Sequence, residues 1–451
     1  MSPTDEQPFL DAVLARPRDD GPRLVYADFL GDTGDPADAA RGDLVRVQVA
    51  LARLPDDHPR RADLVDRQAD LLERHAAAWA APLADLVSGV EFRRGVPDSV
   101  SVDAAAFVAR GDELFRRTRV GRPPGRSFVR RVRLLDPARV LPRLVQCPFL
   151  AAVSELDLCG GDLGNGGVNL LVRSPHLGGV RELDLGFNGL DDAGVRILAR
   201  ASAVPNLHAL ALNDNGQITW DGVRALADSP FFAGLTRLDL SGNDVNDAGV
   251  EAVIRGRATG RLHTLTFDRN HVGDAGVAAL AGSSLLRRML ARDPRLDLRA
   301  NVVGPAGAEA LAGCPALAAV TTLDLGGNYL GDRGVIALAA SGRLGNVRTL
   351  RLSRNQVGDA GAVRLAAAAG AMPELRALDL SGNRLSGRGV EALRAAATAR
   401  GFALDVTGNG AAPKTTPVRV GEVVSAVLTS ISSEDEIAGL RRRVSHPSRP
   451  H

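Results

Sequence analysis

The sequence predicts an α/β fold: a right-handed solenoid with a parallel β-sheet on its concave face and α-helices on its convex face, preceded by a small all-α domain. Two observations carry this prediction. A phrase of two leucines, two residues apart, followed three residues later by asparagine recurs ten times between Val153 and Asn409. Its nine intervals are 26 to 31 residues long, and a fixed period in this range is typical of a solenoid.

The first segment, residues 1–89, is predicted to be helical. Apolar residues recur at helical spacing from Phe9 to Trp79, with breaks that predict four helices. Thr4 and Gln7 form a capping box ahead of the first helix. Ten arginines face seventeen acids in residues 1–90, so this end of the chain is acidic.

Residues 90–150 are predicted to form degenerate capping repeats. A strand is expected at Val96–Val102 and a helix at Ala104–Phe115, then a second strand at Val129–Leu135 and a helix at Val140–Gln146. An atypical coil is expected here because the first regular coil must hide its core edge from water.

A basic stretch lies inside this segment and supports an alternative function. It contains Arg116, Arg117, Arg119, Arg122 and Arg126. The alternative is a nucleic-acid-associated protein that uses the arginine-rich 116–133 segment. We favour a solvated loop, because only one aromatic residue accompanies these arginines and no known nucleic-acid-binding fold surrounds them.

One coil shows how a regular repeat, within residues 151–410, would fold. Leu183 and Leu185 point to the same side of a strand, into the core, so Asp184 between them faces outward. Asn188 follows where the chain leaves the strand. Its amide can both donate to and accept from backbone groups of its own and the neighbouring coil.

A Gly/Asp-rich corner follows each such bend. In Gly273-Asp274-Ala275-Gly276 the aspartate is placed to cap a helix N-terminus. Apolar residues then recur three and four positions apart, which predicts a short amphipathic helix on the outside. A single coil cannot bury its own faces, so the coils stack.

The bend asparagines are expected to form a structural ladder along the stack. They are Asn188, Asn215, Asn243, Asn270, Asn301, Asn328, Asn355, Asn383 and Asn409. The first coil has Gly161 at this position, and the sixth has a longer approach, Ser283 to Arg295. An irregular coil is expected to bend or open the solenoid locally.

These repeats closely resemble leucine-rich repeats of the ribonuclease-inhibitor-like class, which have this length and an α-helical outer face. The phrase from Asp19 to Leu30, followed by Gly34-Asp35-Pro36, is similar to a bacterial repeat-companion domain. The resemblance implies a repeat protein of a large bacterial paralogue family, and it implies no reaction.

A column of charge is predicted on the concave face, at the outward position between the paired apolar residues of each strand. One interpretation is an acidic stripe that receives a basic partner. The other is a structural role, with sideways pairing to arginines such as Arg237 and Arg295. The candidate partner-binding residues are Asp184, Phe187, Asp239, Arg269, Asp297, Arg299, Asp324, Arg351, Arg354 and Asp379.

The sequence offers no convincing catalytic site. Residues 408–415 come close to a phosphate-binding loop, but Pro413 replaces its second glycine. The three cysteines lack CxxC spacing, and the histidines show no zinc-binding pattern. We therefore expect no enzyme activity, no catalytic residue, no metal and no cofactor.

The expected function is a non-enzymatic protein–protein interaction scaffold that binds an unidentified protein on its concave face. We expect a cytoplasmic monomer without a membrane contact, because no signal peptide or spanning segment is evident, and nucleic acid is not the expected partner. The tail, residues 411–451, is expected to be partly disordered with one possible helix.

Overall fold

The computed structural model of the chain describes residues 6–16, 19–54, 58–120 and 126–410. Apart from Gly410, all of these lie in one compact unit, Met1–Asn409. The capping box at Thr4 and the expected tail helix lie outside the described residues.

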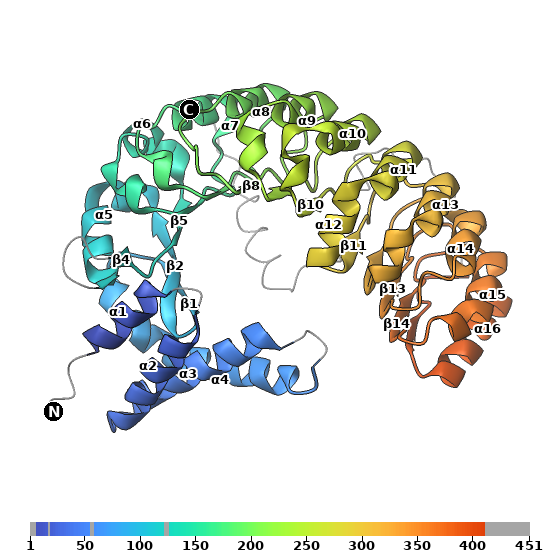
Figure 1. The fold of residues 1–451 in the computed structure, drawn as a ribbon, viewed down its shortest axis with the longest axis horizontal. Helices are drawn as coiled ribbons and strands as arrows, with labels where there is room; N and C mark the ends of the chain where they lie inside the picture. The colour runs from blue at the N-terminus through green and yellow to red at the C-terminus, as the bar shows by residue number, and fades with distance from the viewer. Residues whose placement is uncertain (1–5, 17–18, 55–57, 121–125, 411–451) are drawn as a thin grey trace, which may run out of the picture. The chain divides into compact units, whose positions relative to one another are not determined.

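Four helices open the chain, as the sequence predicts (Figure 1). Their bounds are α1 (Gln7–Ala15), α2 (Gly21–Asp32), α3 (Pro36–Arg53) and α4 (Arg61–Ala80). The start of α3 has a clear local cause, because the side chain of Asp35 accepts a hydrogen bond from Ala37 N at 2.8 Å and Pro36 occupies the first turn. Tyr26 and Val45 lie in a small core that α1, α2 and α3 share with Val96 of the sheet.

An antiparallel hairpin, β1 (Gly89–Arg93) and β2 (Val96–Asp103), forms the first edge of the sheet. Helix α3 holds its turn: Gln48 Nε2 donates to Phe92 O at 2.9 Å, and Gly95 N donates to Gln48 Oε1 at 2.9 Å. A Cβ on Gly95 would lie 2.1 Å from Val45 Cγ2. The N-terminal helices therefore pack directly on the hairpin that covers the sheet edge.

The solenoid continues from this hairpin with alternating strands and outer helices (Figure 1). Its strands are β5 (Arg131–Leu135), β6 (Glu155–Asp157), β7 (Glu182–Asp184), β8 (Ala209–Ala211), β9 (Arg237–Asp239), β10 (Thr264–Thr266), β11 (Arg295–Asp297), β12 (Thr322–Asp324), β13 (Thr349–Arg351), β14 (Ala377–Asp379) and β15 (Ala403–Asp405). Its helices are α5 (Ala104–Thr118), α6 (Leu141–Leu144), α7 (Gly164–Leu171), α8 (Asp192–Ala199), α9 (Trp220–Ala227), α10 (Asp247–Arg255), α11 (Asp274–Gly282), α12 (Ser284–Arg292), α13 (Pro305–Gly313), α14 (Gly331–Ala340), α15 (Asp359–Ala368) and α16 (Gly387–Arg400). Two antiparallel strands of two residues each, β3 (Arg119–Val120) and β4 (Arg126–Ser127), follow the end of α5.

The strands from β2 onward are parallel within each of two sheets, and equivalent leucines lie in register. Leu183 of β7, for example, faces Leu156 of β6 on one side and Leu210 of β8 on the other. These leucines are at most 3% exposed, and one apolar core runs from Leu83 to Phe402. The predicted solenoid with inner strands and outer helices is confirmed.

The bend asparagines hydrogen-bond neighbouring coils. Asn243 Nδ2 donates to Leu212 O of the preceding coil at 2.9 Å and to Leu240 O of its own coil at 3.0 Å, while its Oδ1 accepts from Gly216 N at 3.1 Å. The same pattern continues to Asn409, whose side chain is only half-buried. Each amide thus satisfies backbone groups that a buried bend would leave unpaired.

The first coil has glycine at the asparagine position for a steric reason. A Cβ on Gly161 would lie 2.6 Å from Pro137 Cγ and 2.9 Å from Leu158 O. The proline of the preceding capping coil therefore takes up the space that an asparagine side chain would need.

The predicted capping role holds for Asp191, whose side chain accepts from Ala193 N and Gly194 N at the start of α8, but not for Asp274. The expectation that Asp274 caps its own helix is wrong, because Gly273 is the N-cap of α11 and no side chain caps it. Asp274 Oδ1 instead accepts from Gly304 N and Gly307 N of the next coil, both at 2.7 Å. This inter-coil aspartate bond recurs at four other corners: Asp192, Asp247, Asp332 and Asp359.

The sheet is interrupted at the irregular sixth coil. Strand β10 ends the first sheet and β11 begins the second, and the inserted helix α12 lies between them in the sequence. In the preceding coil, His263 N and Thr264 N both donate to Thr236 O. The equivalent residues here are Pro294, which has no N–H, and Arg295, whose N–H donates to Asp293 Oδ1 at 3.2 Å. The chain itself thus removes two donors of the ladder at this point.

Candidate functional site

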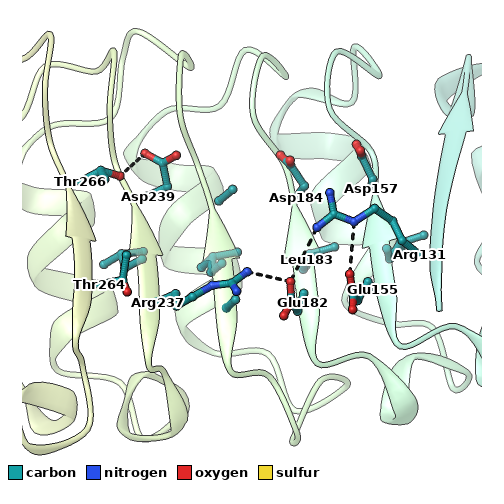
Figure 2. Close-up of a pocket in the computed structure, with 15 residues that line it drawn as sticks. Arg131, Glu155, Asp157, Glu182, Leu183, Asp184, Arg237, Asp239, Thr264 and Thr266 are labelled. Atoms are coloured by element: carbon teal, nitrogen blue, oxygen red, sulfur yellow. Dashed lines mark hydrogen bonds and ion pairs between the residues drawn. The ribbon is translucent and has the colours of Figure 1, made fainter. Parts of the chain in front are cut away.

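The inner face of the first sheet carries a shallow depression of about 220 Å³ (Figure 2). It extends across β5 to β10. Strands β6, β7 and β10 each have a buried middle residue, such as Leu183, between two partly exposed ones. The alternation of the strand therefore delivers two rows of side chains to this face.

The first row is an ion-pair network of side chains from β5, β6, β7 and β9 (Figure 2). Arg131 Nε lies 3.2 Å from Glu155 Oε2, and its Nη2 lies 3.8 Å from Glu182 Oε2. Arg237 Nη2 reaches Glu182 Oε2 from the other side, at 2.7 Å. Ala209, on the strand between them, is small enough to leave this path open. We did not predict this network from the sequence. The feature of the sequence that could have indicated it is the presence of Arg or Glu at the first strand position of neighbouring repeats.

The second row is the aspartate column. Asp157, Asp184 and Asp239 each accept a hydrogen bond from the backbone N–H two residues later, at 2.9 to 3.0 Å. Asp239 also accepts from the hydroxyls of Ser241 and Thr266, each at 2.6 Å. These hydrogen bonds all come from uncharged groups, so none of them brings a positive charge to the column.

Sideways pairing with arginine, the alternative considered for this column, is wrong at two of the expected positions. Arg237 pairs with Glu182 of the first row, and Arg295 pairs with Asp293 at 2.7 Å. In total, five carboxylates and two guanidinium groups line the depression. The depression is therefore acidic.

The electrostatics of the column show that its charges are crowded. Burial raises the pKa of Asp184, and the negative charges of Asp157 and Asp239 raise it further. In the second sheet, burial raises the pKa of Asp297 to about 6, with a further contribution from Asp268. A carboxylate whose pKa is raised in this way would gain from a nearby cation.

The candidates of the second sheet differ in their accessibility. Asp297 and Asp379 are partly exposed, and each accepts from the N–H two residues later, at 3.0 and 2.8 Å. The expectation that Asp324 projects freely is wrong, because this residue is only 6% exposed and its carboxylate binds Gly326 N at 3.0 Å. Arg351, which is exposed, lies 3.3 Å from Asp324 Oδ2.

The residue before each bend asparagine has a left-handed backbone conformation. In four coils it is glycine, as at Gly242 with φ of 66°. At Phe187, Arg269 and Arg354, large side chains adopt φ of 52° to 54°. This conformation costs a non-glycine residue about 1–2 kcal/mol of conformational free energy. Phe187 is nevertheless 43% exposed, so burial does not explain its presence.

Three of the predicted contact residues, Arg269, Asp297 and Arg299, belong to a charged cluster beside the interruption of the sheet. Arg269 Nη1 lies 2.8 Å from Asp214 Oδ1, and its Nε lies 3.3 Å from Asp268 Oδ2. Arg299 Nη2 reaches the same Asp268 oxygen at 3.3 Å, and its Nε lies 3.4 Å from Asp297 Oδ2. Asp268 thus links a candidate that follows the last strand of the first sheet to one that follows the first strand of the second sheet.

The arginine-rich segment is only partly described. Arg117 at the end of α5 pairs with Asp85 and Glu113, and Arg116 lies 3.9 Å from Glu113 Oε1. Arg122 lies outside the described residues. The paired arginines are thus partly neutralised, and the nucleic-acid alternative stays a prediction.

The described residues include no group of three or more His, Cys, Asp or Glu side chains placed to hold a metal ion. Cys147 and Cys314 are buried, and burial together with the charges of Asp184 and Asp157 raises the pKa of the Cys159 thiol to about 12. Cys159 is therefore protonated near neutral pH. Within the described ranges, no helix is long and apolar enough to cross a membrane.

Comparison with known proteins agrees with the repeat geometry. The Leucine Rich repeat family matches residues 180–199, 235–253, 295–312, 319–339, 346–366 and 372–393. A search of curated proteins finds no match.

Three solved structures are similar over parts of the chain. An internalin (inlF) from Listeria monocytogenes is 16% identical, with a TM-score of 0.36 over 66% of this chain and 78% of its own. The leucine-rich repeat domain of APL1B is 15% identical, with a TM-score of 0.29 over 54% of this chain and 60% of its own. An internalin C2 (inlC2) from Listeria monocytogenes is 19% identical, with a TM-score of 0.28 over 49% of this chain and 84% of its own.

Scores this low carry no argument about function. The fold assignment rests on the regular coils, the parallel strands in register, the asparagine hydrogen bonds and the six matched segments. This chain therefore contains a leucine-rich-repeat solenoid.

Proposed function

We propose that the chain is a non-enzymatic scaffold that binds a protein partner on the concave face of its repeats. Leucine-rich-repeat proteins generally act in protein–protein interactions. The observation that carries the proposal is the acidic depression across β5 to β10, where five carboxylates meet two guanidinium groups. Its strands extend over about 24 Å at the usual strand spacing, which suits a helix or a small domain of a partner.

The expected partner surface is basic. Asp157 and Asp184 accept backbone N–H groups, and the pKa of Asp184 is raised by burial and by its acidic neighbours. A partner lysine or arginine would relieve this repulsion. Complementary charge of this kind accelerates and orients association more than it adds affinity.

The exposed edge residues support the same proposal. Phe187 and Arg354 keep a left-handed conformation that glycine adopts without strain in other coils. Strain that persists at exposed positions is common where a side chain serves binding. We infer that these residues, with Arg269 and Arg299, form the rim of the contact surface.

We further infer that the repeats belong to the ribonuclease-inhibitor-like class and that residues 1–89 form a repeat-companion domain. The period of 27 to 28 residues in most coils and the helix in each outer segment support the class. The packing of α3 on the β1–β2 turn supports a capping role for the N-terminal domain. We expect the protein to act as a monomer.

The experiment compares three baits in an affinity purification from cells of the source. The baits are the full chain, a concave variant with Asp157→Asn and Asp184→Asn, and a control with Glu374→Gln and Glu391→Gln. The concave variant keeps an oxygen for each backbone N–H, and the control removes the same charge from exposed positions on other surfaces.

A protein that the concave variant loses, by about tenfold or more, and that the control retains would support the proposal. Recovery of every bound protein by the concave variant, or recovery of nucleic acid alone, would contradict it. Thermal unfolding of all three baits checks that they fold equally well.

A further inference from the structure

A second cavity, of about 260 Å³, lies at the N-terminal end of the unit, away from the concave strands of the repeats. Helix α1, the β1–β2 turn and residues 127–130 contribute to its lining. The charged residues of this lining are four arginines and one aspartate: Arg23, Arg93, Arg94, Arg130 and Asp98. The cavity is therefore basic, unlike the depression on the repeats.

The β1–β2 turn brings one of these arginines to the cavity. The turn has two central residues, Arg94 with φ of 53° and Gly95 with φ of 79°. A two-residue hairpin turn with two positive φ angles favours Asn-Gly or Asp-Gly. Arginine is an unusual first residue here, and its Nη1 lies 2.9 Å from Asp20 Oδ1.

Positive charge exceeds negative charge around Asp20. Three guanidinium groups share its carboxylate: Arg94, Arg53 with Nε at 3.2 Å, and Arg23 with Nη1 at 3.9 Å. The side chain of Arg23 is only 9% exposed. A charged group this well buried depends on its neighbours for stabilisation, since water reaches little of it.

The same imbalance occurs around Asp98. Arg130 Nε lies 2.9 Å from Asp98 Oδ1, and Arg93 Nη1 lies 3.9 Å from Asp98 Oδ2. Burial lowers the pKa of Arg23, and the charges of Arg94 and Arg130 lower it as well. Among the described residues, five guanidinium groups around two carboxylates thus leave a positive surplus that an anion would neutralise.

An apolar wall completes the cavity. Val13 of α1 and Val96 of β2 are 1% and 5% exposed, and Phe128 is half-buried. Ligand sites combine apolar walls with a few polar groups that orient the ligand. A bare inorganic ion would leave this wall without a contact.

We propose that this cavity binds a small organic anion, in which a carboxylate or phosphate group attached to an apolar body contacts the arginines and the body packs on Val13, Val96 and Phe128. Guanidinium groups suit both oxyanions, because their planar donors match carboxylate and phosphate geometry. The site lies apart from the proposed partner surface and does not depend on it.

The test is a calorimetric titration of the full chain with phenyl phosphate, phenylacetate, inorganic phosphate and the uncharged benzyl alcohol. We expect phenyl phosphate or phenylacetate to bind with a Kd of about 1 mM or below. Inorganic phosphate is expected to bind at least several-fold more weakly, because it lacks the apolar body. Whichever aromatic anion binds more tightly identifies the preferred oxyanion.

The decisive variant is Arg94→Asn. Asparagine suits the first position of this turn, so thermal stability should hold while binding weakens by about tenfold or more. Arg74→Gln is the matched control, because Arg74 is an exposed residue of α4 that pairs with Asp70 at 2.5 Å and does not line the cavity.

No binding of either aromatic anion up to about 10 mM would overturn the proposal. Equal weakening by Arg94→Asn and Arg74→Gln would overturn it too, since general surface charge would then account for the binding. If Arg94→Asn fails to fold, Arg130→Gln is tested in its place against the same control.

Discussion

Replacing Gly222 by alanine is expected to destabilise the third coil, even though alanine favours helices. A Cβ on Gly222 would lie 2.4 Å from Asp192 Oδ1 of the preceding coil. That carboxylate accepts from Gly222 N at 3.0 Å, from Thr219 N at 2.8 Å and from the Thr219 hydroxyl at 2.7 Å. The substitution therefore displaces an aspartate that joins two coils.

The magnitude follows from these contacts. Alanine in place of glycine in an open helix stabilises a protein by about 0.5–1 kcal/mol. Hydrogen bonds to charged groups contribute about 1.5–3 kcal/mol each, and Asp192 makes three, partly exposed to water. We expect Gly222→Ala to cost about 2–3 kcal/mol net, measured by urea unfolding.

Two controls separate this effect from ordinary helix propensity. Gly166 in α7 has no atom within 4 Å of its hypothetical Cβ, so Gly166→Ala should stabilise the chain slightly. In an Asp192→Ala background, Gly222→Ala should cost much less, because the bonds are already lost. Equal or greater stability of Gly222→Ala relative to the wild type would refute the reasoning.

Three further predictions concern the ladder, the acidic column and the strained rim. Asn243→Ala should cost about 1–3 kcal/mol in chemical unfolding, because buried carbonyls lose their donor, and Asn409→Ala should cost less, since its side chain is half-buried; equal losses would count against the ladder. Burial raises the pKa of Asp297 to about 6, above the usual value of an unfolded aspartate, so the contribution of Asp297 to stability is greatest at low pH and declines as pH rises through 6. Asp297→Asn should therefore be more stable than the wild type near pH 7, and this difference in stability should shrink towards pH 4. A constant difference across this range would show that the raised pKa is absent. Phe187→Gly should raise the melting temperature by relieving about 1 kcal/mol of backbone strain while weakening partner binding, and a loss of stability would mean that the ring is structural.

The sequence predicts the repeating part of the fold well, because each repeat has nearly the same spacing of core leucines, bend asparagine and outer helix. Leu183 and Leu185 enter the core, and Asn243 bonds both neighbouring backbones, as their spacing indicates. The sequence also indicates an irregularity where the sheet is interrupted after β10, because the sixth coil contains extra residues and Pro294.

Contacts between coils were harder to predict than contacts within one coil. In the sequence of a single repeat, Asp274 lies next to the start of a helix. Only the stacking of the coils shows that Asp274 Oδ1 accepts hydrogen bonds from Gly304 N and Gly307 N of the next coil. Similarly, Glu182 gains importance only when stacking brings Arg131 and Arg237 to either side of it. The strand β1 escaped prediction because its pairing depends on the turn held by α3.

The candidate site was predicted in outline and differs in detail. The outward position of Asp184 and Asp239 follows from strand alternation and is present in the structure. The burial of Asp324 depends on how neighbouring side chains pack around it, which alternation alone does not determine. Whether these residues bind a partner stays a prediction.

The most direct test of the central claim is photo-crosslinking from a position in the middle of the acidic depression. Ala211 on β8 lines the depression and is partly exposed, whereas Arg364 on α15 is an exposed residue of the outer helices. A photoreactive phenylalanine analogue at position 211 should crosslink the partner, and the same group at position 364 should not. Crosslinking from position 364 with none from position 211 would contradict binding on the concave face.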